Sequence, residues 1–355
     1  MSFKFAAMAA AAAFFLTGAA SCSNDDDAFE AQIESATLKS DAVLGNPKIS
    51  GTSITFYVAT GTDITALAPE FTLSAGATIL PASGVAQDFS KPVEYTVTSA
   101  DGMLVRTYTV SVRTEAALSN NLDEWSKIQT EEGNDKSIYY TPSDADWSTA
   151  NIGNVLLRAI GYNLKNTVDV TTDAHQGTNA AIIRTEFVSD KPVFGMNTPI
   201  ASGSLYLGNF TTGTLMTDPM KCTEFGVPIT RKPVKVEGYY KYLPGEVFTD
   251  EKYNVIAGAK DSCAIYAVVF KGKEPLNGRN VLTSDRIIAK AVIKDGAKPA
   301  YTKFELNLDY KSAADLAGDL MFTIVCSSSW DGNIFKGAVG STLYVDDIKV
   351  TTEYL

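Results

Sequence analysis

The feature that most constrains this chain is a period of two in its apolar residues. Ile54, Phe56 and Val58 alternate with their neighbours, and the same alternation recurs over residues 93–97 and 108–112. Such alternation is typical of a β-strand with one buried face. From residue 28 onward no segment has a long helical period, and Gly and Pro interrupt the chain at short intervals. The pattern predicts an all-β protein.

Length and strand character divide the predicted strands into two modules. The chain has 355 residues, whereas a single hydrophobic core stops growing at roughly 250–300 residues. The pattern over residues 32–114 fits a small Ig-like β-sandwich. Residues 120–355 contain more apolar runs, such as 264–270 and 320–325, which suit the core of a larger β-sandwich.

Composition excludes several classes of function. The chain has 30 basic and 41 acidic residues and a net charge of −11, so nucleic acid, which needs a clustered basic surface, is not an expected partner. The single histidine, His175, excludes multi-histidine metal sites, and the four cysteines contain no CxxC pair. The Walker A and Gly-x-Gly-x-x-Gly phosphate loops do not occur, which argues against nucleotide chemistry.

The first 21 residues have the pattern of a signal peptide. Lys4 precedes an apolar run over 5–16, which is too short for a spanning helix of ~20 apolar residues, and small residues follow. Residues 16–22, Leu-Thr-Gly-Ala-Ala-Ser-Cys, resemble a relaxed bacterial lipobox, which implies that Cys22 is the lipid attachment site. An ordinary signal peptide is the alternative.

Residues 22–31 contain three consecutive aspartates and resemble the export signal that sends Bacteroidetes lipoproteins to the cell surface. The resemblance implies an acidic surface tether on an outer-membrane, lipid-anchored protein. Residues 88–98, the Asp101-Gly102 turn and residues 108–112 resemble the Ig-like modules that open many Bacteroidetes surface lipoproteins, which implies a spacer role for 32–114.

Several stretches of the second module resemble the putative carbohydrate metabolism domain of Bacteroidetes lipoproteins. The resemblance implies a jelly-roll β-sandwich and a glycan-related role, and it assigns no catalytic residue. The matching stretches are 226–233, 238–245, 261–270, 327–332, 335–338 and 340–348.

Glycan binding requires aromatic rings that stack on sugar faces, and this directs attention to the tryptophans. Trp125, Trp147 and Trp330 are the only ones, and each stands among polar residues. Exposed aromatic rings in polar loops are candidate binding platforms, and packing at the end of the sandwich is the alternative for each. Trp330 is the first candidate and Asp331 is a ligand candidate beside it, because serines precede the tryptophan and Asp331 begins a turn after it.

A second candidate group lies in residues 238–242. Alternation places Tyr240 and Tyr242 in the core, with Tyr239 and Lys241 on the other face, where they would contact a sugar or stand as solvated edge residues.

Asp346 and Asp347 lie in the last predicted strand. Many jelly-roll carbohydrate-binding modules hold a structural calcium ion beside an acidic residue of their final strand, and this resemblance implies a calcium site here. Oxygen ligands suit that ion, but the two carboxylates would need several further oxygens from elsewhere.

These observations favour a cell-surface lipoprotein without enzymatic activity that binds a glycan or polysaccharide through its C-terminal module, as part of an outer-membrane uptake complex. One alternative is a glycoside hydrolase, which needs two carboxylates ~5 Å apart for retention and farther apart for inversion. The sequence does not single out such a pair among its 41 acidic residues. The other alternative is a structural or adhesive surface component.

Overall fold

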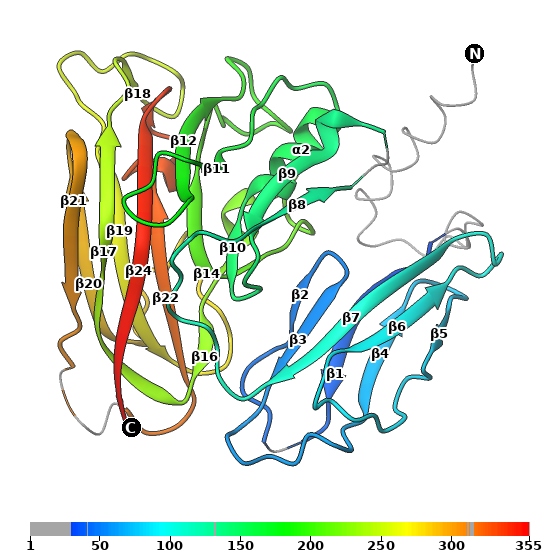
Figure 1. The fold of residues 1–355 in the computed structure, drawn as a ribbon. Coiled ribbons are helices and arrows are strands. Elements are labelled where there is room, and N and C mark those ends of the chain that lie inside the picture. The colour runs from blue at the N-terminus through cyan, green and yellow to red at the C-terminus, as the bar shows by residue number, and fades with distance from the viewer. Residues whose placement is uncertain (1–29, 41, 131–132, 311, 313–315, 355) are drawn as a thin grey trace, which may run out of the picture.

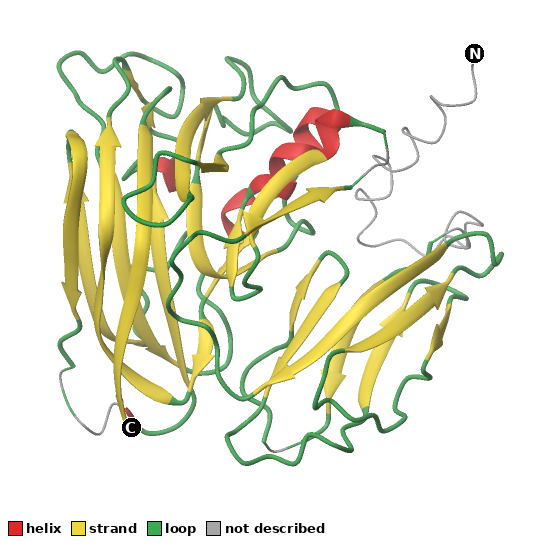
Figure 2. Cartoon of the chain, viewed as in Figure 1, coloured by secondary structure: helices red, strands yellow, loops and turns green. Residues whose placement is uncertain are grey.

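The computed structural model describes residues 30–354 except 41, 131–132, 311 and 313–315 (Figure 1). The expected signal peptide, Cys22 and the tether up to residue 29 lie outside the described residues. In the described part, strands predominate and one α-helix is present (Figure 2). The all-β prediction is confirmed. None of the helices in this part is long and apolar enough to cross a membrane.

The first module is a sandwich with a core of its own. A five-stranded sheet has the order β2-β3-β7-β6-β5, and β1 pairs with β4. Alternate residues such as Tyr95 and Val110 are almost fully buried between them, as the period of two predicts. The strand β3 differs from that prediction, because Thr55 and Tyr57 are buried together with Phe56. The strands are β1 (Ile33–Leu38), β2 (Lys48–Ser50), β3 (Ser53–Tyr57), β4 (Pro69–Leu73), β5 (Thr78–Leu80), β6 (Val93–Thr98) and β7 (Val105–Arg113).

The second module is a larger sandwich of two sheets. Its seven-stranded sheet consists of β10 (Trp147–Thr149), β14 (Ser204–Phe210), β22 (Leu320–Ser327), β19 (Cys263–Lys271) and β20 (Ile287–Asp295) in that order, with β15 (Thr223–Phe225) on β14 and β16 (Val227–Ile229) on β22. Its six-stranded sheet consists of β11 (Val168–Thr171), β12 (Ala180–Phe187), β24 (Thr342–Tyr354), β17 (Arg231–Leu243) and β21 (Lys298–Asn307), with β13 (Ile200–Ser202) on β12. Smaller pairs are β8 (Trp125–Gln129) with β9 (Ile138–Pro142) and β18 (Phe248–Thr249) with β23 (Gly337–Ala338).

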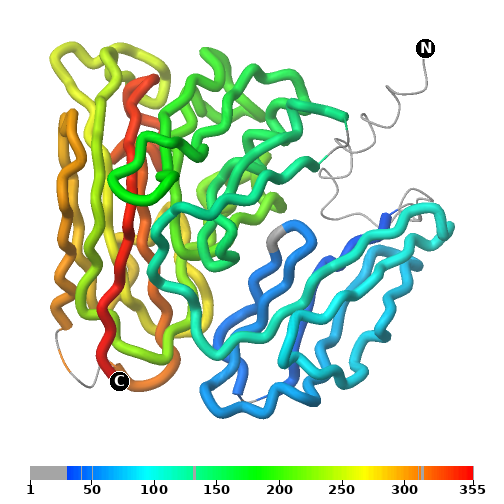
Figure 3. Tube along the Cα trace, in the orientation of Figure 1, coloured from blue at the N-terminus to red at the C-terminus, as the bar shows by residue number. Residues whose placement is uncertain are grey.

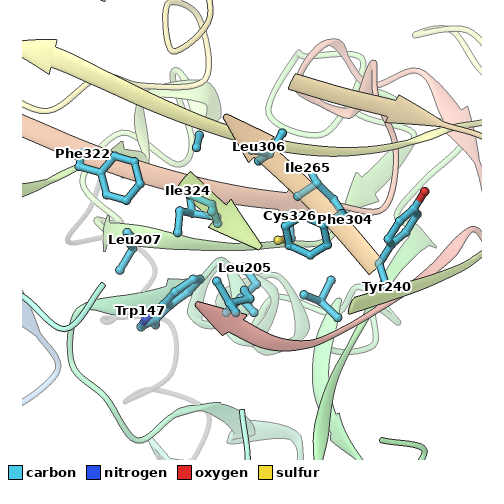
Figure 4. Packing of buried hydrophobic residues seen from close by; sticks show 14 of the residues in the cluster. Trp147, Leu205, Leu207, Tyr240, Ile265, Phe304, Leu306, Phe322, Ile324 and Cys326 are labelled. Carbon is cyan, nitrogen blue, oxygen red and sulfur yellow. The ribbon is translucent and has the colours of Figure 1, made fainter. Parts of the chain in front are cut away.

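The middle strands β19 and β22 of the seven-stranded sheet are buried on both faces. Along β19, Ile265 and Val269 face the core between the two sheets, whereas Tyr266 and Phe270 belong to a second apolar cluster on the outer face (Figure 4 shows part of the inner core). Because loops cover this outer face, β19 is apolar at consecutive positions instead of alternating. The outer cluster forms part of the candidate site described below.

The helix α2 (Asn151–Ala159) departs from the sequence prediction, which contains no helix there. It is short, contains Gly153 and has no side-chain N-cap, so local signals for it are weak. Tertiary hydrogen bonds hold the helix in place. The buried side-chain amide of Asn151 accepts hydrogen bonds from the backbone N–H groups of Thr167 (3.1 Å) and Val168 (3.2 Å). It donates to the carbonyls of Tyr140 (3.0 Å) and Val168 (2.6 Å).

The two modules meet at a buried carboxylate. The β2–β3 hairpin lies beside the second sandwich (Figure 3). Asp146, fully buried, accepts hydrogen bonds from the Tyr57 hydroxyl, from Arg113 Nη1 (3.1 Å) and from the backbone N–H of Ala117 (2.6 Å). Lys48 is buried nearby, and its Nζ has no hydrogen-bond partner among the described residues. Burial lowers the pKa of Lys48 to about 8, although Asp146 opposes that shift.

Candidate functional site

A cavity of about 440 Å³ lies on the outer face of the seven-stranded sheet. Its lining comes from β13, the two end residues of β14, β15, β19, the end of β22 and the helix α2, together with residues of the segments 188–198, 215–220, 278–283 and 330–335. The volume falls within the range of roughly 300–1,000 Å³ that is usual for small-molecule sites. The site is therefore assembled from segments that are far apart in the sequence.

Serine hydroxyls form a polar strip in the lining. Ser202 and Ser204 come from β13 and β14, and Ser327 and Ser329 come from the end of β22 and the residues after it. The Ser202 and Ser204 hydroxyls lie 3.1 and 3.2 Å from the Ser327 hydroxyl, and the Ser329 hydroxyl donates to Asp261 Oδ2 (2.6 Å). These hydroxyls are held in place before any ligand binds.

Asp261 lies behind this strip and does not line the cavity. Besides Ser329, its Oδ2 accepts hydrogen bonds from the Ser341 hydroxyl (2.7 Å) and from the backbone N–H of Ala338 (2.8 Å). Burial raises the pKa of Asp261, although these donors favour the carboxylate. Its role is to fix the serine strip.

Apolar side chains form two walls. The first wall is part of the outer cluster of the sheet and includes Tyr266, Leu282 and Trp330. The indole ring of Trp330 is half-buried, and Lys294 Nζ lies 4.8 Å from its centroid in a cation–π contact. The second wall includes Leu157, Val188, Val193 and Met196, from α2 and the segment that follows β12.

Two charged side chains, Arg279 and Asp331, belong to the lining among the described residues. Arg279 is already paired: its Nη2 and Nε donate to the two carboxylate oxygens of Asp218 at 2.8 and 3.2 Å. Asp331 is the one carboxylate of this lining. The site therefore offers hydroxyl groups and apolar surface with little free charge.

Comparison with protein families accounts for most of the chain. Residues 33–112 match the model described as SGBP, N-terminal, and residues 120–351 match the model of the putative carbohydrate metabolism domain. The chain belongs to the putative carbohydrate metabolism domain family. Every residue that lines the cavity lies within the matched range 120–351, hereafter the carbohydrate domain.

Two crystal structures from Bacteroides resemble the chain. A putative glycoside hydrolase from Bacteroides thetaiotaomicron is 33% identical, with a TM-score of 0.79 and coverage of 95% of this chain and 100% of that one. A putative glycoside hydrolase from Bacteroides vulgatus is 27% identical, with a TM-score of 0.56 and coverage of 68% of this chain and 100% of that one. No curated protein matches the chain.

The carbohydrate domain brings two of the predicted ligand residues into the cavity, Trp330 and Asp331. Trp147 is instead a core residue with 2% exposure, packed among Leu205, Leu207 and their neighbours between the sheets (Figure 4). Its polar sequence neighbours do not indicate exposure, because β10 directs this ring to the core although it is an edge strand of the sheet. Trp125 packs partly against the same core, and its Nε1 donates to the Leu122 carbonyl (2.7 Å).

Tyr239 and Lys241 lie on the outer face of the opposite, six-stranded sheet, away from the cavity. Tyr240 and Tyr242 are buried in the core, as their alternation predicts. The loop 172–178 folds over Tyr239 and Lys241. The His175 ring stacks on Tyr239 at a centroid distance of 3.5 Å, and Lys241 pairs with Asp173.

Asp346 and Asp347 hold the same loop. Asp346 is fully buried, and its carboxylate accepts backbone hydrogen bonds from His175 (2.6 Å), Gln176 (3.1 Å) and Asp347 (2.9 Å). Asp347 Oδ2 lies 3.2 Å from His175 Nδ1. Within the described ranges, no three metal-ligating side chains come together as a metal site would require. In this structure the two aspartates bind protein groups.

Several lining residues have no local signal in the sequence. Ser202, Ser204, Met196 and Leu282 stand in unremarkable polar or mixed segments, and only the fold brings them beside Trp330. The run of serines before Trp330 is the one sequence feature that points to the strip.

Proposed function

We propose that the carbohydrate domain binds glycans in the cavity on its seven-stranded sheet. The observation that carries the proposal is the serine strip beside the apolar wall of Tyr266, Leu282 and Trp330. A pyranose has hydroxyls around its edge and C–H groups on its faces. A site with fixed hydroxyls next to aromatic rings matches both parts of such a ligand.

The charges of the site favour a neutral glycan. The positive charge of the Arg279 guanidinium is balanced by its ion pair with Asp218, which weakens its attraction for an anionic sugar. Asp331 would repel one, and the net charge of −11 disfavours approach of a polyanion.

Binding is better supported than hydrolysis. Glycoside hydrolases use two carboxylates that flank the scissile bond. The described lining contains one, Asp331, while Asp261 is buried behind the strip and engaged by several donors. The resemblance to two structures named as glycoside hydrolases supports hydrolysis as the second candidate function.

We also propose that the protein lies at the surface of the outer membrane, where it is anchored through acylated Cys22 and delivers glycans to an uptake complex. This proposal is supported by the lipobox-like segment 16–22 and by the match of residues 33–112 to the SGBP N-terminal model. Labelling with a palmitate analogue tests the anchor. We expect label on the wild type and none on Cys22→Ala; equal labelling of both would refute acylation at this cysteine.

A glycan array with the full chain tests the binding function, followed by affinity measurements on the glycans that bind. We expect Trp330→Ala to weaken binding by about 30-fold, a loss of about 2 kcal/mol, because it removes the stacking ring. Trp125→Ala is the matched control, since it removes the same ring outside the cavity and should leave the affinity unchanged. Assay of new reducing ends on the same glycans separates binding from hydrolysis.

Three results would count against glycan binding in the cavity. These are an array without binding, an affinity that Trp330→Ala does not change, and an equal loss in the Trp125 variant. Release of new reducing ends would show that the domain hydrolyses glycans, and hydrolysis would then replace binding as the proposed function.

A further inference from the structure

The two walls of the cavity differ in what they offer a ligand. The first wall has the aromatic rings of Tyr266 and Trp330, which suit a sugar face. The second wall has the aliphatic or thioether side chains of Leu157, Val188, Val193 and Met196, with the ring of Phe194 at its rim. A sugar hydroxyl against this wall would lose its water partners without gaining a hydrogen bond, which is unfavourable. A bare glycan therefore matches only part of the cavity.

The serine strip connects the two walls. Ser202 follows Ala201, which packs on the cluster of Val188 and Val193. Ser329 precedes Trp330, which packs on the cluster of the first wall. A ligand whose hydroxyls bind the strip thus has an aromatic wall beside it and an aliphatic wall within reach.

The second wall is open to solvent at its rim. Phe194 is 42% exposed and Leu157 and Met196 are partly exposed, whereas Val188 and Val193 are already buried. An uncharged apolar group that covers this surface gains the free energy of removing it from water. Arg279 is paired with Asp218, so the charges of the site add no requirement for an ionic group on the ligand.

We infer that the glycan bound here carries an uncharged apolar substituent, such as a short acyl or alkyl chain or an aryl group, which packs on the wall of Leu157, Val188, Val193 and Met196. This inference rests on the proposed glycan binding and specifies its ligand. The sugar hydroxyls bind the serine strip, and the substituent excludes water from the second wall.

Calorimetric titration of the full chain with methyl, butyl, hexyl and octyl β-D-glucosides and β-D-galactosides, each below its micelle concentration, tests the inference. For at least one of the two sugars we expect affinity to rise about fourfold per added methylene until the wall is covered, the fold-change that about 0.8 kcal/mol per buried CH₂ gives. Met196→Gln should flatten this dependence. Met103→Gln, at an 85% exposed position of the first module, is the matched control and should keep it.

The outcomes separate this inference from the proposed function. Equal affinity for methyl and octyl glycosides, or a chain-length dependence that Met196→Gln does not change, overturns the apolar substituent and leaves glycan binding intact. 1-Octanol supplies the chain without the sugar. If it binds as tightly as the octyl glycosides, the sugar contributes nothing, and glycan binding fails together with the inference.

Discussion

At the residue scale, Gly332 determines how closely the Trp330 turn approaches the serine strip. A Cβ added at this position would lie 2.3 Å from the Cβ of Ser202 and 2.5 Å from its hydroxyl. No side chain fits such a gap without movement of the backbone. The glycine therefore allows the turn after β22 to pack directly on β13 and complete one end of the cavity.

Replacement of Gly332 by alanine should force these two segments apart. We expect Gly332→Ala to lower the free energy of unfolding by about 1–3 kcal/mol through overpacking, and to weaken glycan binding as the strip moves. Denaturant unfolding measures the first effect. Gly296→Ala is the matched control, because its added Cβ meets nothing within 4 Å, and a change within about 0.5 kcal/mol is expected there. Equal stability of both variants would contradict the close packing.

For the tryptophans, the polarity of the neighbouring residues did not distinguish a ring in a turn from a ring on a strand. Trp147 and Trp330 both stand beside aspartates, yet Trp147 is 2% exposed and Trp330 lines the cavity. Local polarity does not reveal which face of a three-residue strand points inward. That depends on the pairing of β10 with β14, which the sequence alone does not show.

At the element scale, α2 depends on Asn151 more than on helix propensity. One side chain satisfies two backbone N–H groups of the segment before and within β11, together with two carbonyls. The helix in turn supplies Leu157 and Asn154 to the cavity lining. The position of this part of the lining thus follows from one buried amide.

Asn151→Ala should destabilise the protein although alanine is the better helix former. It leaves buried backbone groups of Thr167 and Val168 without partners, and we expect a loss of about 3 kcal/mol in the free energy of unfolding. Asn163→Ala, at an exposed position after the helix, is the matched control. The idea that tertiary hydrogen bonds anchor α2 fails if both variants unfold at the same denaturant concentration.

The strands were predictable from their period, but their arrangement was not. Alternation identified β3, β6 and β7 of the first sandwich and the inward direction of Tyr240 and Tyr242, but it did not single out β1, β2, β4 and β5. The continuous apolar run of β19 indicated burial without showing that its second face is covered by loops rather than by another sheet. The cavity lies on that second face. The sequence pattern therefore indicated a buried strand next to the cavity, but it did not locate the cavity.

At the scale of the whole molecule, Lys48 lies in the interface between the modules, where its burial lowers the stability of the native state. Its native pKa of about 8 is below the ordinary value of 10.5 because burial disfavours the ammonium form. Below pH 8 the amine is charged in both the native and unfolded states, and the full destabilisation by the buried ammonium group is present. Between pH 8 and 10.5 the native state loses the proton first, so this group makes the protein more stable as pH rises.

Lys48→Met should therefore stabilise the protein at pH 7, by about 3 kcal/mol, because the native pKa of about 8 already includes the attraction of Asp146. The advantage over the wild type should shrink between pH 8 and 10.5. Unfolding curves at pH 7, 9 and 10.5 measure this difference. Lys91→Met changes an exposed lysine and should show neither effect. A pH-independent advantage would mean that the pKa of Lys48 is not lowered in the native interface.

The carboxylate of Asp146 also limits how this protein can be recombined. It belongs to the second sandwich, whereas two of its donors, Tyr57 and Arg113, belong to the first. A chimera that joins the second sandwich to a foreign N-terminal module would enclose a carboxylate stripped of those donors, which is strongly unfavourable. The short stretch between the two family matches therefore separates the modules in the sequence, but in the structure the modules remain linked by these hydrogen bonds. Any successful graft must carry the tyrosine and the arginine across with it.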